Sequence, residues 1–393
     1  MSDQDHHPRY GIKNLWLQAG ESYYPYAVHL HRAEVLDLVG DWQGSLATLD
    51  DNYDFARKAG AKKQEADSEI KRIRLLRYMG RNSDFLEPLN RAMETYRELG
   101  DQYGINQALN EVGLAYRFSG DIPKAEECFT DLIARSEKIA DTKHQMSGLG
   151  NLSQIHMING KHEQALKCLD RCMEISQRQD DNTFSTILLG SIGNAHFFLE
   201  DYDLALEYYR KQLALAYKYG DLANISVAVG NIGNIHNRRG EYDRALECYR
   251  EKLELSQKLG YAMGIQQALG NMGLALSESG RYPEARQCFE RQLSISSQTD
   301  DPESIEGACS GLGNVFAQLG DYENSEKYFK QAIAVDLEQG FQNDLAADYL
   351  GLAEMYLKKG AAVQAREAAN LALAAAREIG DDELAAKAML LLE

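Results

Sequence analysis

Histidines recur along this chain at a regular spacing that could hold metal ions. His156, His196 and His236 lie 40 residues apart. A single zinc ion needs its nitrogen ligands about 2 Å from the metal. Equivalent atoms of stacked helices lie about 8–10 Å apart, so these histidines could not share one ion. The same register holds other rings elsewhere in the chain, at Tyr116, Phe316 and Tyr356. A position shared by histidine, tyrosine and phenylalanine is typical of packing, so we expect packed rings here and no metal site.

Four of the six cysteines share a second register with the same spacing, at Cys128, Cys168, Cys248 and Cys288. If consecutive units are stacked helices, equivalent atoms lie about 8–10 Å apart. That distance exceeds the Cα separation of about 7 Å that a disulfide can span. Cys168 and Cys172 are one helical turn apart and equally unsuited to a bridge. We therefore expect reduced, mostly buried thiols.

A third motif contains glycines and asparagines, in the sequence GNIGNIHNRRG at residues 230–240. Loops that bind phosphate or clamp a nucleic-acid backbone need glycine in a turn, with free backbone N–H groups. Here the motif recurs inside segments of helical periodicity, as GNLS at 150–153, GSIG at 190–193 and GNMG at 270–273. The glycines therefore indicate helix packing rather than ligand binding.

Catalytic motifs are absent from the sequence. It contains no GxSxG, no HExxH and no GxxxxGK[ST]. The many acidic residues fall at expected helix caps and outward faces, where solvation accounts for them. We expect a non-catalytic protein without a cofactor.

The net charge narrows the range of partners. The chain has 393 residues and a net charge of −18, which repels nucleic acids and anionic lipids. Hydrophobic residues make up 44% and charged residues 26%, as in a folded, soluble protein. No segment approaches the roughly 20 apolar residues of a membrane span. The start of the chain lacks a secretory signal pattern, so we expect a cytoplasmic protein that binds neither nucleic acid nor membrane.

Glycines also mark the boundaries of the predicted helices that carry these residues. They recur every 40 residues, with Glu200 in the one gap, at Gly40, Gly80, Gly120, Gly160, Gly240, Gly280, Gly320 and Gly360. A second series falls midway, and Asp often follows, as in Gly220-Asp221. Glycine after one helix and aspartate capping the next indicate paired helices. Each unit is predicted to contain two helices of about 17 residues.

Small residues recur at one position of each first helix and again twelve residues later, in the second. The first series is Ala33, Gly113, Ser153, Gly193, Gly233, Gly273, Gly313 and Ala353. Because interior glycine costs a helix about 1 kcal/mol relative to alanine, we expect a close approach of backbones there. The second unit departs from this pattern, with Ile73 and Phe85 at the small positions. Its Pro88 predicts a second helix that starts late or kinks.

The pattern NIGNIHNRRGEYDRALECYREKLELS resembles the tetratricopeptide repeat in its forty-residue form. The resemblance covers residues 21–380 as nine repeats. It leaves 1–20 as an N-terminal tail or cap, and 381–393 as a capping helix or truncated tenth repeat. It implies an all-α fold, an α-solenoid of tandem antiparallel helix pairs forming a right-handed superhelix.

In this family the first helices line a concave groove that holds an extended peptide or a partner helix. Residues one, four and five after the small position share one helix side. That side carries three arginines, then aromatic residues, then amides that can both donate and accept hydrogen bonds. The residues expected in the groove are Arg74, Arg77, Arg117, Phe118, Gln154, Asn194, Phe197, Phe198, Asn234, Asn237, Arg238, Asn314 and Gln318.

The resemblance therefore implies a non-catalytic interaction scaffold or adaptor. Its ligand is expected to be a protein or peptide with acidic and apolar residues. Similar repeats occur in spindle-orientation adaptors and in bacterial signalling arrays, so a sensor domain of a larger bacterial signalling protein remains an alternative. A peptide-pheromone receptor is another alternative. Such receptors resemble a repeat array behind an N-terminal helical bundle, for which residues 1–20 are too short.

Overall fold

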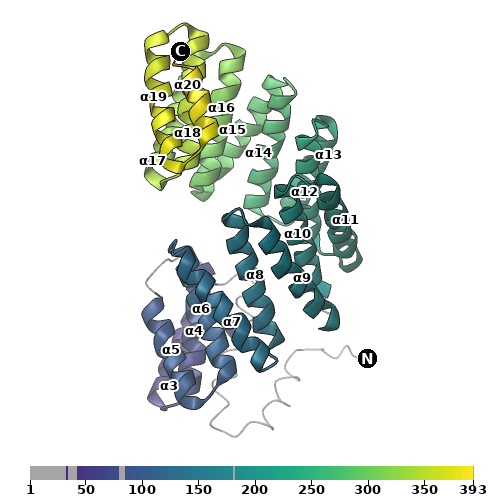
Figure 1. The fold of residues 1–393 in the computed structure, drawn as a ribbon, viewed down its shortest axis with the longest axis vertical. Helices are drawn as coiled ribbons and strands as arrows, with labels where there is room; N and C mark the ends of the chain where they lie inside the picture. Colours follow the sequence, from purple (N-terminus) through teal and green to yellow (C-terminus); the bar gives the residue numbers. More distant parts are fainter. Residues whose placement is uncertain (1–31, 34–41, 79–84, 180–181, 393) are drawn as a thin grey trace, which may run out of the picture. The chain divides into compact units, whose positions relative to one another are not determined.

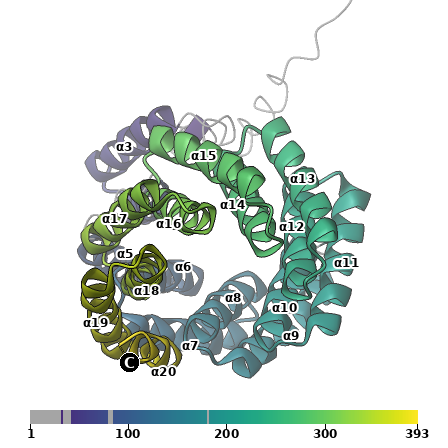
Figure 2. The same ribbon diagram turned by 90° about the horizontal axis from the view of Figure 1, so that it is seen from above.

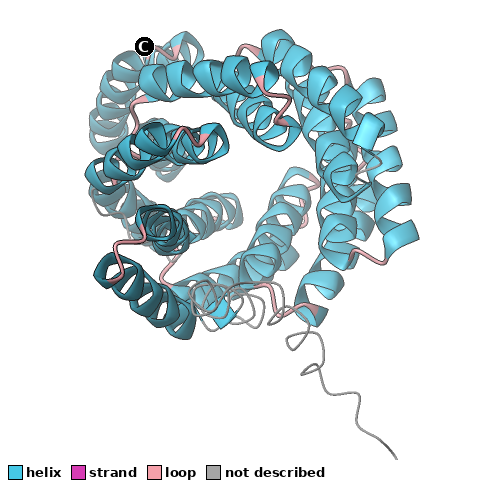
Figure 3. Cartoon of the chain, turned by 90° about the horizontal axis from the view of Figure 1, so that it is seen from below, coloured by secondary structure: helices cyan, strands magenta, loops and turns pink. Residues whose placement is uncertain are grey.

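The structure is a computed structural model that describes residues 32–33, 42–78, 85–179 and 182–392 (Figure 1). Every regular element in these ranges is a helix, and Figure 3 shows no strand among them. The proposed tail at 1–20 lies outside the described residues. Within the described ranges, no helix combines the length and apolar character needed to cross a membrane. The all-α prediction is thus confirmed.

The helices are separated by very short turns. Their bounds are α3 Trp42–Lys58, α4 Lys62–Tyr78, α5 Leu86–Leu99, α6 Gln102–Phe118, α7 Ile122–Lys138, α8 Thr142–Ile158, α9 His162–Gln179, α10 Asn182–Phe198, α11 Tyr202–Tyr219, α12 Leu222–Arg238, α13 Tyr242–Lys258, α14 Ala262–Glu278, α15 Tyr282–Thr299, α16 Pro302–Leu319, α17 Tyr322–Gln339, α18 Gln342–Lys359, α19 Ala362–Ile379 and α20 Asp382–Leu390. The even-numbered helices α4 to α18 are the first helices of the predicted repeats, and the odd-numbered ones are the second helices.

The helix boundaries follow the predicted turn chemistry. Gly220 ends α11 at a φ of 67°, a left-handed conformation that favours glycine. Asp221 then caps α12, because its side chain accepts a hydrogen bond from the Asn224 N–H at 3.0 Å. Glu200, which fills the gap in the glycine series, adopts the same left-handed conformation at a φ of 60°. The glycine and aspartate periodicity therefore predicted the described turns correctly, while Gly40 and Gly80 lie outside the described residues.

The small residues of the first helices make room for a ring. A Cβ added to Gly273 would lie 2.6 Å from the ring of Phe289, and one added to Gly233 would lie 2.7 Å from that of Tyr249. The same relation holds for Gly313 and Phe329. In each case an aromatic side chain from the second helix of the repeat fills the space above the glycine. We had expected two backbones to approach there, but the close neighbour is this side chain.

In the second repeat, large side chains occupy the positions that hold small residues in the other repeats. Its α5 begins only at Leu86, and Pro88 lies within the first turn, so the late start is confirmed. Ile73 and Phe85 are 3% and 8% exposed and pack with Leu89 in one cluster. Larger side chains therefore replace the small ones where α5 is shorter.

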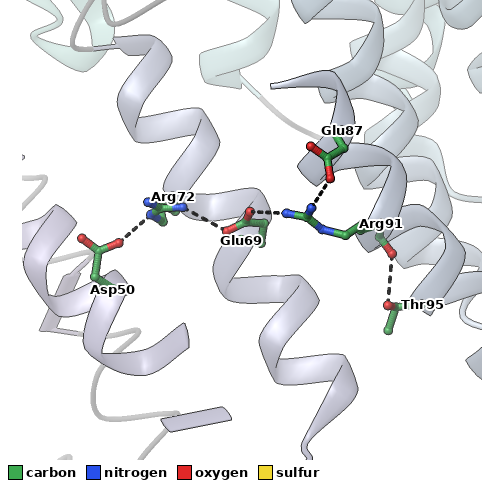
Figure 4. A network of polar contacts seen from close by, with 6 residues as sticks. All are labelled: Asp50, Glu69, Arg72, Glu87, Arg91 and Thr95. Atoms are coloured by element: carbon green, nitrogen blue, oxygen red, sulfur yellow. Dashed lines mark hydrogen bonds and ion pairs between the residues drawn. The ribbon is translucent and has the colours of Figure 1, made fainter. Parts of the chain in front are cut away.

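The chain divides into two compact units, residues Met1–Asp181 and Asn182–Glu393. In the first unit, a polar network links the predicted first and second repeats (Figure 4). Glu69 of α4 is 6% exposed and lies between Arg72 and Arg91, and Arg72 also pairs with Asp50 of α3 at 2.5 Å. These ion pairs join α3, α4 and α5 along one side.

In the second unit, consecutive first helices contact one another, as α10 with α12, α12 with α14, α14 with α16, and α16 with α18. Figure 2 shows α12, α14, α16 and α18 on the inner side of this unit's curve, with α11, α13, α15, α17 and α19 outside. Residues on the exposed side of the first helices therefore face the concave side of the unit. The last helix, α20, packs on α18 and α19.

Candidate functional site

The expected groove residues are distributed over both units. Arg74, Arg77, Arg117, Phe118 and Gln154 lie on α4, α6 and α8 in the first unit. The asparagines, with Phe197, Phe198, Arg238 and Gln318, lie on α10, α12 and α16 in the second unit. Each set is described within its own unit.

In the first unit, two of the three arginines bind a buried carboxylate. Arg74 donates to Glu111 through Nε at 3.0 Å, and Arg77 donates to the other carboxylate oxygen, also at 3.0 Å. Glu111, on α6, is only 2% exposed. These two arginines therefore join α4 to α6, and Glu111 offsets part of the positive charge that we expected to attract a ligand.

Arg117 is held by neutral groups instead. Its guanidinium donates to the Gln154 side chain on α8 and lies 5.0 Å from the centre of the Phe118 ring. Among the described residues it forms no ion pair. Burial lowers its pKa, and the positive charge of the neighbouring Arg77 lowers it further. Phe118 is 53% exposed, so it does not pack into the next repeat.

In the second unit, the asparagines form a ladder from one repeat to the next. The side-chain oxygen of Asn234 accepts hydrogen bonds from the Tyr249 hydroxyl at 2.8 Å and from Asn271 Nδ2 at 3.1 Å. One repeat earlier, Asn194 accepts from Tyr209 and Asn231 at 2.7 and 3.2 Å. The oxygens of these amides are fully used by the protein, which leaves only their N–H groups for a ligand.

Next to this ladder lies a cavity of about 700 Å³, and all of its walls belong to the second unit. Four of the expected groove residues line it: Phe197, Asn234, Asn237 and Arg238. The remaining walls come from Arg239, Gly240, Tyr242, Tyr249, Asn271, Leu274 and Glu278. Leu274 and Glu278 are one and five residues after Gly273, so they lie on the helix side that defines the expected groove. Tyr242 and Tyr249 come from α13, a second helix. The spacing of residues on the first helices did not predict that these two rings would reach the cavity.

The cavity carries charges of both signs. The guanidinium of Arg238 lies 6.0 Å from the centre of the Phe197 ring, and Arg238 is exposed. Arg239 pairs with Asp203 at 2.7 Å. Asn237 donates to Glu278 at 2.9 Å, while its own side-chain oxygen is buried and accepts no hydrogen bond from the protein. Arg238 therefore keeps an available positive charge beside an apolar ring.

The other expected residues of the second unit lie outside this cavity. Phe198 is 59% exposed and meets the Phe197 ring edge-on at 5.7 Å. Asn314 donates to the Ser310 carbonyl of its own helix at 3.1 Å, and Gln318 is exposed. Asn194 contributes to the ladder without lining the cavity.

A family model described as "Tetratricopeptide repeat" matches residues 144–218, 221–298, 264–338 and 304–378. These matches cover more than half of the chain. The chain belongs to the tetratricopeptide repeat family. A second model, described as "Anaphase-promoting complex subunit 5", matches residues 24–117. No curated protein matches the sequence.

Several solved tetratricopeptide structures share the fold. The apo form of RapI has a TM-score of 0.58 and 15% identity, over 70% of this chain and 98% of that chain. A Rap protein complexed with Competence and Sporulation Factor has a TM-score of 0.55 and 14% identity, over 84% and 97%. A signal transduction ATPase with a tetratricopeptide repeat sensor from Pyrococcus horikoshii has a TM-score of 0.60 and 14% identity, over 99% and 68%. At these identities the similarity is one of fold.

Tetratricopeptide packing also accounts for the histidines and cysteines. His156 is 9% exposed, and burial lowers its pKa. His236 instead contacts Glu241 at 2.7 Å, and His196 stacks on Tyr208. The six cysteines are unpaired, and burial raises the pKa of Cys172 to about 12. These thiols are therefore protonated near neutral pH.

One expectation about the acidic residues of this tetratricopeptide chain is wrong. We had assigned them all to helix caps and outward faces. Glu111, Glu306, Asp336 and Asp348 are instead buried in the structure. Glu111 is paired with arginines, but the other three form a cluster of their own. Their burial was not predicted, because we took every acidic residue to be solvated whatever its position in the repeat.

Proposed function

We propose that this tetratricopeptide repeat protein is a non-catalytic interaction scaffold that binds an extended segment of a protein partner. The binding site that we propose is the cavity of the second unit. One observation carries the proposal: the oxygen of Asn234 is occupied by Tyr249 and Asn271, which leaves the N–H of this amide free. The Asn234 side chain lines the cavity.

A peptide backbone presents the complementary group, a carbonyl acceptor, at every residue. The Asn234 amide nitrogen can donate to such a ligand carbonyl. Such contacts do not depend on the ligand's side chains, so they would hold an extended chain of any sequence.

Selectivity would come from the surrounding side chains. Phe197 and Leu274 offer apolar surface, and Leu274 is 51% exposed. Arg238 lies over the edge of the same surface with its charge available. We therefore propose a ligand in which an acidic group, or the C-terminal carboxylate, lies close to an apolar side chain.

A displayed library of random dodecapeptides, selected on the intact chain, tests this proposal. The informative variant is Asn234→Asp, which keeps the oxygen that Tyr249 and Asn271 need but removes the free N–H. Selected peptides should bind it at least tenfold more weakly, because one hydrogen bond is lost and a carboxylate faces the ligand carbonyl. The melting temperature should change little.

The matched control is Asn370→Asp, on the exposed side of α19, where the amide only bonds its own helix. This control should leave peptide affinity unchanged. Selected peptides that bind Asn234→Asp and the parent protein equally well would show that the ligand surface lies elsewhere.

A regulatory role is the second candidate, with this chain as a sensor domain or a peptide-pheromone receptor. The fold similarity to the Pyrococcus horikoshii protein spans 99% of this chain, and that protein's repeats are described as a sensor. The Rap structure is a complex with a named factor. Sequencing the complete gene would test the sensor alternative, because a sensor domain of a larger signalling protein has an output domain in the same polypeptide.

A further inference from the structure

Three carboxylic acids from three consecutive helices meet in the interior of the second unit. They are Glu306 of α16, Asp336 of α17 and Asp348 of α18, with exposures of 8%, 0% and 2%. One carboxylate oxygen from each lies within 4.8 Å of the others. A cluster of this kind inside a protein calls for a compensating positive charge.

The other repeats of the same chain show what these positions normally contain. One repeat earlier, the equivalent residues are Gln266, Ser296 and Ala308. Two repeats earlier they are Ser226, Ser256 and Ala268, and the two serines share a hydrogen bond at 3.2 Å. Asn106 and Ser136 form the same neutral pair in the first unit. The repeat fold therefore needs only a neutral pair here, and the three acidic residues are an addition to it.

The protein does not neutralise this added charge with its own cations. Both oxygens of Asp336 are buried without a hydrogen-bond partner, and so is one oxygen of Asp348. The other Asp348 oxygen accepts from the Ser310 hydroxyl at 2.5 Å. No lysine or arginine among the described residues forms an ion pair with any of the three. Asp344 and Glu303 nearby carry the same sign of charge.

We propose that Glu306, Asp336 and Asp348 bind one hard divalent cation, for which Ca²⁺ is the best fit. All the donor atoms are oxygens, and each of the three carboxylates brings one of them within 4.8 Å of the other two. Ca²⁺ takes six to eight oxygen ligands at about 2.3–2.6 Å, so opposed ligands lie about 4.8 Å apart. Mg²⁺ needs about 2.1 Å and a stricter octahedron. Zn²⁺ prefers nitrogen and sulfur ligands, and neither is part of the set.

A cation at this position would join two repeats. Glu306 and Asp336 belong to the predicted eighth repeat, and Asp348 belongs to the ninth. Since repeats are held mainly by their neighbours, an ion between them stabilises the C-terminal end of the array. The site lies on helices α16 to α18, away from the walls of the peptide cavity, so it stands independently of the proposed function.

The experiment compares the intact chain with the variant Glu306→Gln, Asp336→Ser, Asp348→Ala. This variant places at the three positions the residues that the preceding repeat has at Gln266, Ser296 and Ala308. After treatment with EDTA, calorimetric titration with CaCl2 should show one ion per parent chain. Millimolar Ca²⁺ should raise the parent melting temperature by about 5 °C. The variant should fold, bind no ion and show no such rise.

The matched control is Glu354→Gln, which removes an exposed carboxylate from the same helix as Asp348 and should keep the full Ca²⁺ response. If the triple variant does not fold, Asp348→Asn takes its place. The proposal is overturned if the parent chain binds no Ca²⁺, Mg²⁺ or Mn²⁺ by calorimetry. It is also overturned if the folded variant binds ions as the parent does.

Discussion

At the scale of single residues, the asparagines of the first helices combine a structural and a binding role. The oxygen of Asn234 stabilises the packing of Tyr249 and Asn271, while its N–H remains available at the cavity. Replacing it with alanine would therefore strand a buried tyrosine hydroxyl, and folding and binding would be affected together. Substitution by aspartate separates the two roles, because it changes only the free side of the amide.

The interior glycines differ in what surrounds them, and this difference predicts opposite effects of one substitution. Gly273→Ala drives a methyl group to 2.6 Å from the Phe289 ring, so we expect a loss of about 1–3 kcal/mol of unfolding free energy. Gly307→Ala meets no atom within 4 Å. It should gain up to about 1 kcal/mol from helix propensity. Urea denaturation of both variants measures the contrast, and equal effects would refute the ring-contact explanation.

Lys252 should make stability depend on pH. It is 9% exposed, its ammonium donates to Gln267 at 3.0 Å, and burial lowers its pKa to about 8. Between pH 8 and the ordinary lysine value near 10.4, the unfolded chain binds more protons than the folded one. The contribution of Lys252 to stability therefore rises with pH across this window, by about 3 kcal/mol at most.

The variant Lys252→Gln, which matches Gln212 and Gln292 in the neighbouring repeats, isolates this contribution. Thermal or urea unfolding at pH 8 and at pH 10 should show a smaller pH-dependent gain for the variant than for the parent chain. Cysteine and tyrosine titration affects both proteins alike and cancels in the difference. Identical pH profiles would show that the Lys252 ammonium is solvated.

At the scale of elements, each helix start is an independent local feature that the sequence either supplies or omits. Asp121 and Asp321 cap α7 and α17 through their side chains. Ala361 occupies the same place before α19, with a similar backbone at φ −94° and ψ 67°, but it makes no side-chain cap. The turn geometry is therefore retained where the capping hydrogen bond is missing.

Ala361→Asp should supply this missing cap and stabilise the chain by about 1 kcal/mol. The reverse change, Asp321→Ala, should cost about the same, because the Asn324 N–H loses its acceptor. Shifts in the urea midpoint measure both effects. A neutral result for Ala361→Asp, alongside a loss for Asp321→Ala, would mean that α19 starts differently in solution.

At the scale of the whole molecule, the two compact units predict separable behaviour. The second unit has hydrophobic clusters made only of its own residues, such as the one around Tyr249, Phe289 and Phe316. All the walls of the cavity also belong to it. The proposed binding site is therefore complete within residues 182–393.

Residues 182–393 expressed alone should show a helical circular dichroism spectrum and a cooperative melt. Peptides selected on the intact chain should bind this fragment within about threefold of their original affinity, because no cavity wall has been removed. A folded fragment that has lost peptide affinity would place part of the ligand surface in residues 1–181. The Asn234→Asp variant of the fragment serves as the binding control.

The helices and their turns were predictable from the amino-acid sequence, because glycine, aspartate and apolar spacing act over a few residues at a time. Gly220 and Asp221 end one helix and start the next through contacts within a single turn. Family membership followed from the same local pattern repeated many times. The position of four cavity residues was also predictable. Asn234, Asn237 and Arg238 share one side of α12, and Phe197 holds the position of Asn237 one repeat earlier, on α10.

The partners of each side chain were not predictable from the sequence, because hydrogen bonding and burial depend on atoms far apart in the chain. Arg74 and Arg77 looked free to attract a ligand until Glu111, more than thirty residues away, was found between them. The glycines looked like backbone contacts until a ring from the next helix was found above them. Glu306, Asp336 and Asp348 looked solvated, because no local pattern reveals that three helices bury them at one point.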